Sequence, residues 1–418
     1  MLTVVAPILR CEWDLSSFPY AVLLMSTLFS MTVSGGLTAT FGDRFGRKPI
    51  AVISAIGITA SGVLCAFAKK YWEFLALRIV IGFFLGMGTG PVIALSGEVA
   101  PKAFRATALS VLPLPWGLGV SIGAGIAYLV IEPYGWQGLL LAISLVFSPC
   151  IIFFSLVRES PRYDYHYRGD VKSAEKTIKR IIELNRRDIP EFKLVESELQ
   201  KGDQEVIGCG MVWRTLKRTE NVKNGLIILT LTFFAVFNYY LYAYITPRIL
   251  NEGYCSSQKV TVQESCTYDK SVLFNLAVVS LAGPLGDIIS LILQHFLGRR
   301  KVFIGSAIIT AIIPFSLYYC FSHTYLLVCL VLLRANLDAT CLAHNILMSE
   351  YMPTVIRSFM TSMVGVSARW GGVIASFSSE YIYQTNSRLG IAIIQGCAVA
   401  CIVCLVLLKR ETMGASLG

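Results

Sequence analysis

Two stretches of the chain, far apart in sequence, repeat one arrangement of apolar and charged residues. Residues 73–105 read EFLALRIVIGFFLGMGTGPVIALSGEVAPKAFR, and residues 326–357 read LLVCLVLLRANLDATCLAHNILMSEYMPTVIR. In each stretch an arginine stands inside a long apolar run, and the run ends in Glu-x-x-Pro-x-x-x-Arg. The tight turns that precede the two units also match, as Gly42-Asp43-Arg44-Phe45-Gly46-Arg47-Lys48 and Gly298-Arg299-Arg300-Lys301. A repeat of this length indicates that the chain consists of two related halves.

The composition of the whole chain is that of a membrane protein. Of the 418 residues, 55% are hydrophobic and only 15% are charged, whereas about a quarter of the residues of a soluble chain are charged. A helix needs about 20 apolar residues to cross the bilayer core. On that basis the sequence predicts eleven spans, at 19–41, 49–68, 73–97, 106–131, 138–157, 224–247, 271–297, 302–321, 326–349, 358–382 and 389–408.

The start of the chain accounts for this odd number of spans. Residues 1–9 are apolar but too few to cross a bilayer, and no basic segment precedes them as it would in a signal peptide. We interpret them as the end of a first transmembrane helix that is largely missing here. The sequence therefore predicts an all-α membrane protein of two six-helix bundles.

The basic residues between the spans predict which side faces the cytoplasm. Most of them fall on one side, which is therefore predicted to be cytoplasmic by the positive-inside rule. The net charge of +10 does not indicate nucleic-acid binding, because the basic residues lie between apolar runs. The longest loop on that side, 158–223, is a linker between an N-terminal bundle over 1–157 and a C-terminal bundle over 224–418. Within it, Asp170 is placed to begin an amphipathic helix that either packs beneath the bundles or contacts anionic lipid. The apolar stripe of this helix is flanked by Lys172, Lys176, Lys179 and Arg180.

Most of the 12 cysteines lie inside apolar runs, where they are expected to be small buried side chains, and the sequence predicts no metal site. Cys255 and Cys266 differ because they lie in a polar loop that faces the outside or a vesicle lumen, where thiols oxidise. They form a candidate disulfide. Cys11 lies on the same side and is an alternative partner for either one.

The repeated charges suit a latch at the cytoplasmic surface. Glycines allow two helices to turn sharply there, and an acid at one helix end can bond arginines at its neighbours. Such a latch holds one conformation and breaks in the other. The alternative, that the arginines only obey the positive-inside rule, is disfavoured by the repeat. The candidate gating residues are Asp43, Arg44, Gly46, Arg47, Arg78, Glu98 and Arg105 in the first half, and Arg334, Glu350 and Arg357 in the second.

These motifs resemble those of the major facilitator superfamily. The turn at Asp43 is similar to the superfamily's loop motif, and Arg158-Glu159-Ser160-Pro161-Arg162-Tyr163 and Glu411-Thr412-x-Gly414 are similar to motifs of its sugar and organic-ion transporters. Cys11-Glu12-Trp13, Arg162-Tyr163-Asp164 and Ala368-Arg369 look closest to the synaptic vesicle 2-related protein group. The resemblance covers essentially the whole chain and implies the major facilitator fold.

The chain departs from the family pattern at two loops. Ala39 stands where the early loop of the family has its first glycine, and His295-Phe296-Leu297 stands where the second-half loop would carry Asp-Arg before its glycine. The second latch therefore lacks its loop acid, and gating is expected to be asymmetric or partly lost. Related transporters also place acidic residues in the first helix.

Ionisable side chains at mid-membrane depth are costly, so each is a candidate for binding substrate or a coupled ion. The second half holds four of them: Asp287, Asp338, His344 and Arg369. An acid paired with Arg369 in a structural ion pair is the alternative. The span over 224–247 adds an aromatic cluster that suits an organic or cationic solute or serves as interfacial anchors; its residues are Asn238, Tyr239, Tyr240, Tyr242 and Tyr244.

The duplication and the latch motifs favour a secondary active transporter of a small organic solute that works by alternating access, with a proton or cation as its coupled ion. The alternative, which the missing loop acid favours, is a transport-deficient, transporter-like vesicle membrane protein with a binding or regulatory role. No nucleophile elbow, H-E-x-x-H or Walker motif occurs, so neither an enzyme nor an ATP-driven pump is predicted and no cofactor is expected. The host membrane is the plasma membrane or that of an intracellular, for example synaptic, vesicle.

Overall fold

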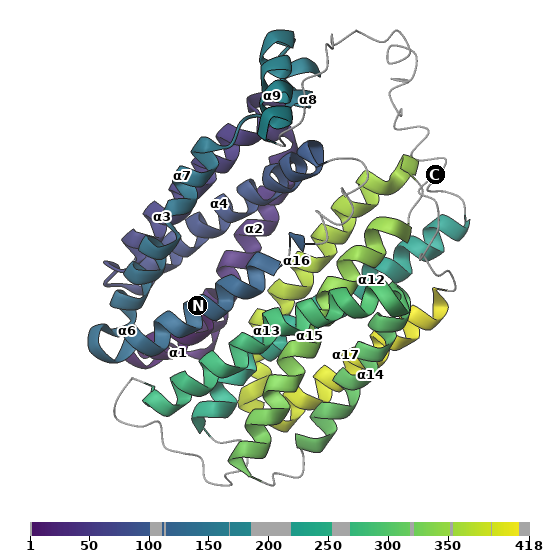
Figure 1. The fold of residues 1–418 in the computed structure, drawn as a ribbon. Helices are drawn as coiled ribbons and strands as arrows, with labels where there is room; N and C mark the ends of the chain where they lie inside the picture. Colours follow the sequence, from purple (N-terminus) through teal and green to yellow (C-terminus); the bar gives the residue numbers. More distant parts are fainter. Residues whose placement is uncertain are drawn as a thin grey trace.

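The computed structural model describes the backbone of residues 2–100, 111–112, 114–166, 168–184, 219–252, 268–317, 322–351, 354–385 and 387–408. Side chains are described in these ranges except at 36–41, 43, 166, 184, 219–220, 252, 345–351, 354–359, 383 and 387. All regular secondary structure in the described ranges is helical, as the sequence predicts (Figure 1).

The first half of the chain forms a set of antiparallel helices. Its elements are α1 (Leu2–Glu12), α2 (Ser17–Phe45), α3 (Arg47–Cys65), α4 (Tyr71–Val99), α6 (Leu114–Phe147) and α7 (Pro149–Leu156). Gly135, at φ 66°, interrupts α6, so that the 43 apolar residues from Leu114 to Leu156 provide two crossings of about 20 residues each. The short α1 packs against α2, α6 and α12.

The linker and the second half complete the chain. The linker contributes α8 (Pro161–His166) and α9 (Val171–Leu184), which lie together at one end of the molecule (Figure 1). The second half contains α12 (Thr219–Glu252), α13 (Lys270–Leu297), α14 (Arg299–Leu317), α15 (His323–Tyr351), α16 (Thr354–Thr385) and α17 (Ser387–Leu407).

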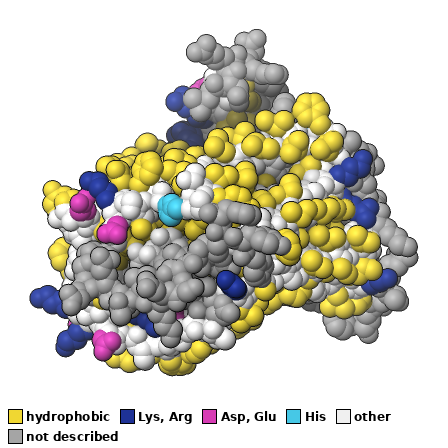
Figure 2. All heavy atoms as spheres, turned by 90° about the horizontal axis from the view of Figure 1, so that it is seen from below, with side chains coloured by type: hydrophobic (Ala, Val, Ile, Leu, Met, Phe, Trp, Pro, Cys, Tyr) yellow, Lys and Arg dark blue, Asp and Glu magenta, His cyan; other side chains and the backbone are white. Residues whose placement is uncertain are grey.

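The predicted spans coincide with these helices. In the described part of the chain nine helical segments are long and apolar enough to cross a membrane, and the segment that α6 and α7 form accounts for two crossings. The remaining predicted span, 358–382, lies in α16, which has 32 residues but is less apolar because it carries residues such as Arg369 and Glu380. Hydrophobic side chains predominate on the described rim of the molecule when it is viewed from the end opposite α8 and α9 (Figure 2), as expected for a surface that faces lipid.

Small residues bring the helices of each half close together. Gly82 and Gly86 of α4 lie against the carbonyl oxygens of Thr27 and Met31 in α2, so tightly that an added Cβ would overlap them. Glycines that recur every four residues lie on one face of a helix and allow a neighbouring helix to approach this closely. In the second half Gly286 of α13 lies in the same way against the Ala335 carbonyl of α15.

In the described part of the chain, the two halves meet mainly along two pairs of helices. One pair is α2 with α16 and the other is α6 with α13. Side chains that join the first pair begin with Ser17 and Gln384, 2.6 Å apart, near the end opposite α8 and α9, which we call the outer end. They extend to Phe29 and Trp370, with ring centroids 6.4 Å apart.

Candidate functional site

The turn between α2 and α3, on the side predicted to be cytoplasmic, brings together part of the predicted latch. Gly46 joins α2 to α3 with a φ of 100°, a conformation that side chains other than glycine rarely adopt. The sharp turn places Arg47 at the start of α3, where its Nη2 lies 3.2 Å from Glu98 Oε1 of α4. Both side chains are largely buried, at 9% and 16% exposed, so this ion pair is less screened than a surface pair.

Glu159 of the linker supports the same turn. Its carboxylate accepts hydrogen bonds from the backbone N–H groups of Arg47, at 3.2 Å, and Lys48, at 3.1 Å. These are the first residues of α3, where a negative charge is stabilised by the unpaired N–H groups and the helix dipole. Sequence reasoning quoted Glu159 only as part of a resembling motif and missed that it caps α3.

Tyr163 of α8 completes the turn. Its ring lies under the Arg47 guanidinium at 4.9 Å, and its hydroxyl donates to the Arg44 carbonyl at 3.1 Å. The Arg-Glu-Ser-Pro-Arg-Tyr motif thus fixes the cytoplasmic ends of α2 and α3. The side chain of Asp43 and the whole of Arg105 lie outside the described residues.

Arg78 lies far from this turn. It is in the second turn of α4, 20 residues from Glu98, and an α-helix of that length spans about 30 Å. Its guanidinium is buried and stacks over the Phe74 ring at 4.8 Å. Arg78 and the residues of the turn, which the sequence analysis groups together, therefore lie at different depths of the membrane.

The second-half turn is built differently. Gly298 has a φ of 89° and joins α13 to α14, but here Arg300 donates from Nε and Nη2 to the Leu405 carbonyl, at 3.3 and 3.1 Å. Leu405 belongs to the last turn of α17, whose carbonyls lack helical partners. Glu350 and Arg357 have side chains outside the described set, as do Cys255 and Cys266. Cys11 is disulfide-bonded, and its partner lies outside the described residues.

A buried ion pair occupies the middle of the second half. Arg334 Nε lies 2.8 Å from Asp338 Oδ2 one turn later in α15, and both side chains are about 5% exposed. Arg334 also donates to the Tyr239 hydroxyl at 2.9 Å and lies 4.8 Å from the centre of that ring. Asp338 is therefore neutralised by Arg334 rather than by Arg369, which the sequence had suggested as the partner of an acid.

Two other candidates face the opposite half. Asp287 of α13 is 5% exposed, and its Oδ2 would lie 3.2 Å from a Cβ added at Gly117 of α6. Arg369 of α16 lies so close to Gly35 of α2 that an added Cβ there would overlap the guanidinium. Neither side chain forms an ion pair with a described residue. Both charges thus sit at the junction of the halves, one at each pair of contacting helices.

Of the tyrosines of α12, two are buried and two, Tyr240 and Tyr244, are half-buried. Tyr239 and Tyr242 are 8% and 3% exposed, and Tyr242 donates to the Leu330 carbonyl at 2.7 Å. Tyr240 stacks on Tyr244 with ring centroids 6.5 Å apart, and the Tyr244 hydroxyl reaches across to the Leu24 carbonyl of α2 at 3.2 Å. These contacts of the tyrosines are made within the protein, with α15, with α2 and with one another.

The remaining two candidates lie inside the second half. Asn238 donates to the Ile394 carbonyl at 3.2 Å and thereby ties α12 to α17. His344 is 2% exposed, lies edge-on to Phe303 at 5.9 Å, and has neither ring nitrogen hydrogen-bonded within the described residues. No group of three or more metal-ligating side chains occurs in the described part of the chain.

A charged cluster at the outer end joins the two halves, and sequence reasoning missed it. Glu380 of α16 is fully buried and bonds both Arg248 of α12 and Arg10 of α1, the latter at 2.5 Å. Tyr20 of α2 lies between the two arginines, 5.1 Å from Arg10 and 4.9 Å from Arg248. Gln384 adds a bond to Glu380 at 2.7 Å. We call Arg10, Tyr20, Arg248 and Glu380 the outer cluster.

Paired helical bundles with buried charges at their junction are the arrangement of major facilitator membrane transporters. The model of the family described as "Sugar (and other) transporter" matches residues 9–262, and the chain belongs to this family. It is therefore an integral multi-pass membrane transporter of the major facilitator superfamily and not an enzyme.

Individual relatives and solved structures agree with this assignment. The chain is 27% identical over 430 residues to the synaptic vesicle 2-related protein of Rattus norvegicus, covering 100% of this chain and 76% of the relative. It is 25% identical to the putative transporter SVOPL of Homo sapiens, covering 100% of this chain and 86% of the relative. The inward-open xylose transporter XylE from E. coli superposes with a TM-score of 0.74 at 17% identity, covering 99% of this chain and 94% of XylE, so the fold is shared.

Proposed function

We propose that this protein is a secondary active transporter that carries a small organic solute across its membrane by alternating access between the two halves. The observation that carries the proposal is the set of contacts between the two halves at the outer end of the molecule. At the outer end, Glu380 of the second half bonds Arg10 of the first, while Tyr20 and Arg248 meet across the same junction. At the cytoplasmic end, the described contact between Arg47 and Glu98 stays within one half.

Alternating access requires contacts between the two halves, such as those of the outer cluster, because these contacts must form in one state and break in the other. Contacts within one half serve a second need, since each half moves largely as a rigid body. The described contacts supply both classes, and they correspond to a conformation that is closed at the outer end.

The solute site that this arrangement favours lies where charges of one half face the other. Asp287 against Gly117 and Arg369 against Gly35 meet this condition, and Tyr240 lies beside Arg369 within the same junction, close to Gly372. We assign Arg369 and Tyr240 to the solute and Asp287 to a coupled proton or cation. Bonds inside the second half are formed by Asp338, Tyr239 and Asn238. We assign these residues a supporting role, in which they fix the helices that carry the site.

Flux measurements on the full chain in proteoliposomes test this proposal. A panel of radiolabelled sugars, organic cations and organic anions would be offered with and without an imposed proton gradient. We expect uptake of at least one class, and loss of that uptake in Asp287→Asn and Arg369→Gln. The matched control is Glu132→Gln, which removes one carboxylate from an exposed ion pair with Lys270. Absence of flux across the panel, with ligand binding retained, would instead support a binding or regulatory role.

A further inference from the structure

The linker helix α9 carries a basic face that is separate from its packing face. Its N-terminus is capped by Asp170, whose Oδ1 accepts from the Ser173 N–H at 3.0 Å. The apolar face rests on α8, where Ala174 is fully buried and Ser173 Oγ bonds Asp164 at 2.8 Å. The opposite face therefore remains available to a partner.

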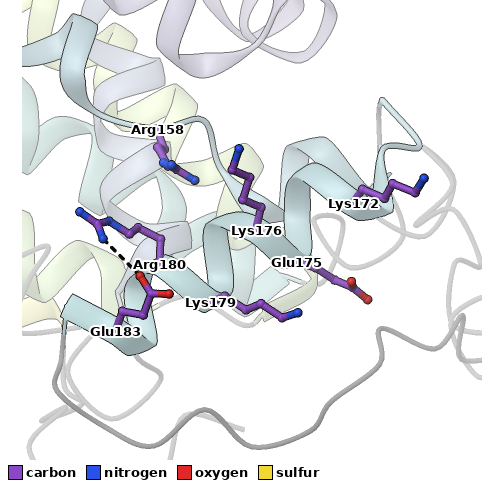
Figure 3. A pocket seen from close by; sticks show the side chains of 7 residues that line it. All are labelled: Arg158, Lys172, Glu175, Lys176, Lys179, Arg180 and Glu183. Atoms are coloured by element: carbon purple, nitrogen blue, oxygen red, sulfur yellow. Dashed lines mark hydrogen bonds and ion pairs between the residues drawn. The ribbon is translucent and has the colours of Figure 1, made fainter.

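This basic face closes a hollow against the chain segment that enters the linker. The hollow has a volume of about 520 Å³, and its lining residues are Arg158, Lys172, Glu175, Lys176, Lys179, Arg180 and Glu183. Figure 3 shows Arg158, which comes from the segment that follows α7, between Lys176 and Arg180 of α9. Two separate elements thus direct cations into one space.

The charges of the hollow are not balanced from within the described protein. Arg180 and Glu183 pair at 3.2 Å, which leaves four cations and one carboxylate. Arg158, Lys172, Lys176 and Lys179 form no ion pair with any residue in the described part of the chain. Four like charges held around one space repel one another, so an anion with several negative charges is the ligand that this space favours.

The position of Arg158 places the hollow at the membrane surface. Only two residues earlier, Leu156 ends α7 and is 77% exposed, and Phe153 on the preceding turn is 63% exposed. Such large apolar side chains at the end of a membrane-spanning segment face lipid tails. Arg158 therefore lies at headgroup level, since the headgroup layer extends about 5–7 Å beyond the hydrocarbon core.

We propose that this hollow binds the headgroup of an anionic membrane lipid that carries more than one negative charge, such as a phosphorylated inositol lipid. A cluster of Lys and Arg residues immediately cytoplasmic to a transmembrane helix is suited to such lipids, which enrich the cytoplasmic leaflet. Arg158 and Lys176 contact the phosphate groups from opposite sides, and Lys172 and Lys179 extend the contact along α9. The bound lipid anchors the linker to the bilayer next to the turn that Glu159 supports.

The test uses the detergent-purified full chain and soluble, short-chain lipids. Binding of dioctanoyl phosphatidylinositol 4-phosphate would be measured by thermophoresis for the native chain and for Lys172→Gln/Lys176→Gln. We expect the Kd to rise about 25-fold in the variant, because each lysine near anionic lipid contributes roughly a factor of five. The matched control is Lys69→Gln/Lys70→Gln, which removes two exposed lysines at the opposite membrane surface and leaves the Kd within about twofold.

Further arms separate the sources of the anion. Dioctanoyl phosphatidylcholine is expected to bind at least tenfold more weakly than the inositol lipid, and inorganic phosphate at equal concentration is expected not to displace the lipid. Equal affinity for both lipids, or an equal loss in both variants, overturns the proposal. Tight binding of inorganic phosphate alone would assign the hollow to a soluble anion and would overturn the lipid assignment. If the first variant fails to purify, Lys176→Gln/Lys179→Gln provides the same comparison.

Discussion

Replacing Glu380 by glutamine tests whether the outer cluster closes the molecule. Glu380 is fully buried and bonded to Arg248, whose side chain is 10% exposed, and to Arg10, which is 32% exposed. Breaking a buried ion pair by removing one partner costs about 3–5 kcal/mol, because a buried charge is left uncompensated. Two features reduce this cost: glutamine still offers a carbonyl acceptor, and the Tyr20 ring remains against Arg248. We therefore expect Glu380→Gln to destabilise the closed outer end by about 2–4 kcal/mol.

The assay is the distance between spin labels at Lys69→Cys and Thr385→Cys, which flank the junction at the outer ends of α4 and α16. A loss of about 2–4 kcal/mol corresponds to a shift of roughly 30- to 700-fold in the ratio of closed to open molecules. We expect a second, longer distance to become populated in Glu380→Gln. Adding Arg248→Met should return part of the closed population, since no uncompensated buried cation remains.

An exposed ion pair at the same junction supplies the control. Lys270 and Glu132 join α13 to α6 at 2.9 Å, and both side chains are 59% exposed. Such pairs contribute about 0–1 kcal/mol, so Glu132→Gln should leave the distance distribution nearly unchanged. If Glu380→Gln and Glu132→Gln give the same distribution, the outer cluster does not hold the molecule closed and the reasoning fails.

Three further predictions concern the packing of each half. Glu159→Gln should lower the melting transition of the purified protein, because α3 loses a charge worth about 0.3–1 kcal/mol at its N-terminus; an unchanged transition at low salt would contradict the cap. Gly286→Ala should sharply reduce the folded yield in size-exclusion chromatography, whereas Gly305→Ala, with open space around it, should not. Arg334→Met should destabilise the protein by about 3–5 kcal/mol, and Asp338→Leu in the same chain should restore much of this stability. Restoration by a change at Arg369 instead would show that Arg334 and Asp338 are not paired.

The helices were predictable because their signal is local. An apolar run of about 20 residues is visible in the sequence whatever it packs against, so each predicted span coincides with a helix. The pairing of Arg47 with Glu98 was likewise within reach, since the repeat marks both residues and the glycine turn brings them to the same surface. The pairing of Arg334 with Asp338 had a local signal too, their spacing of four residues in a helix, which the sequence reasoning did not use.

The outer cluster was not predictable in this way. Arg10 and Glu380 are 370 residues apart, and no periodicity or motif connects them. In the sequence, Arg10 and Arg248 are marked only as basic residues that follow the apolar runs 1–9 and 224–247. Because the partner of a charge at a helix end depends on which helices are neighbours, the cluster emerges only from the packing of α1, α2, α12 and α16.

The two halves share ancestry in their motifs but differ in what holds their cytoplasmic turns. In the first half, the carboxylate of Glu98 binds the Arg47 side chain, and the carboxylate of Glu159 binds the backbone at the start of α3. In the second half, Arg300 binds a backbone carbonyl of α17, and the residues before Gly298 include Phe296, which is 71% exposed. A carbonyl dipole binds a cation less strongly than a carboxylate does. Among the described contacts, the two turns therefore differ in their acceptors, which are carboxylates in the first half and a backbone carbonyl in the second.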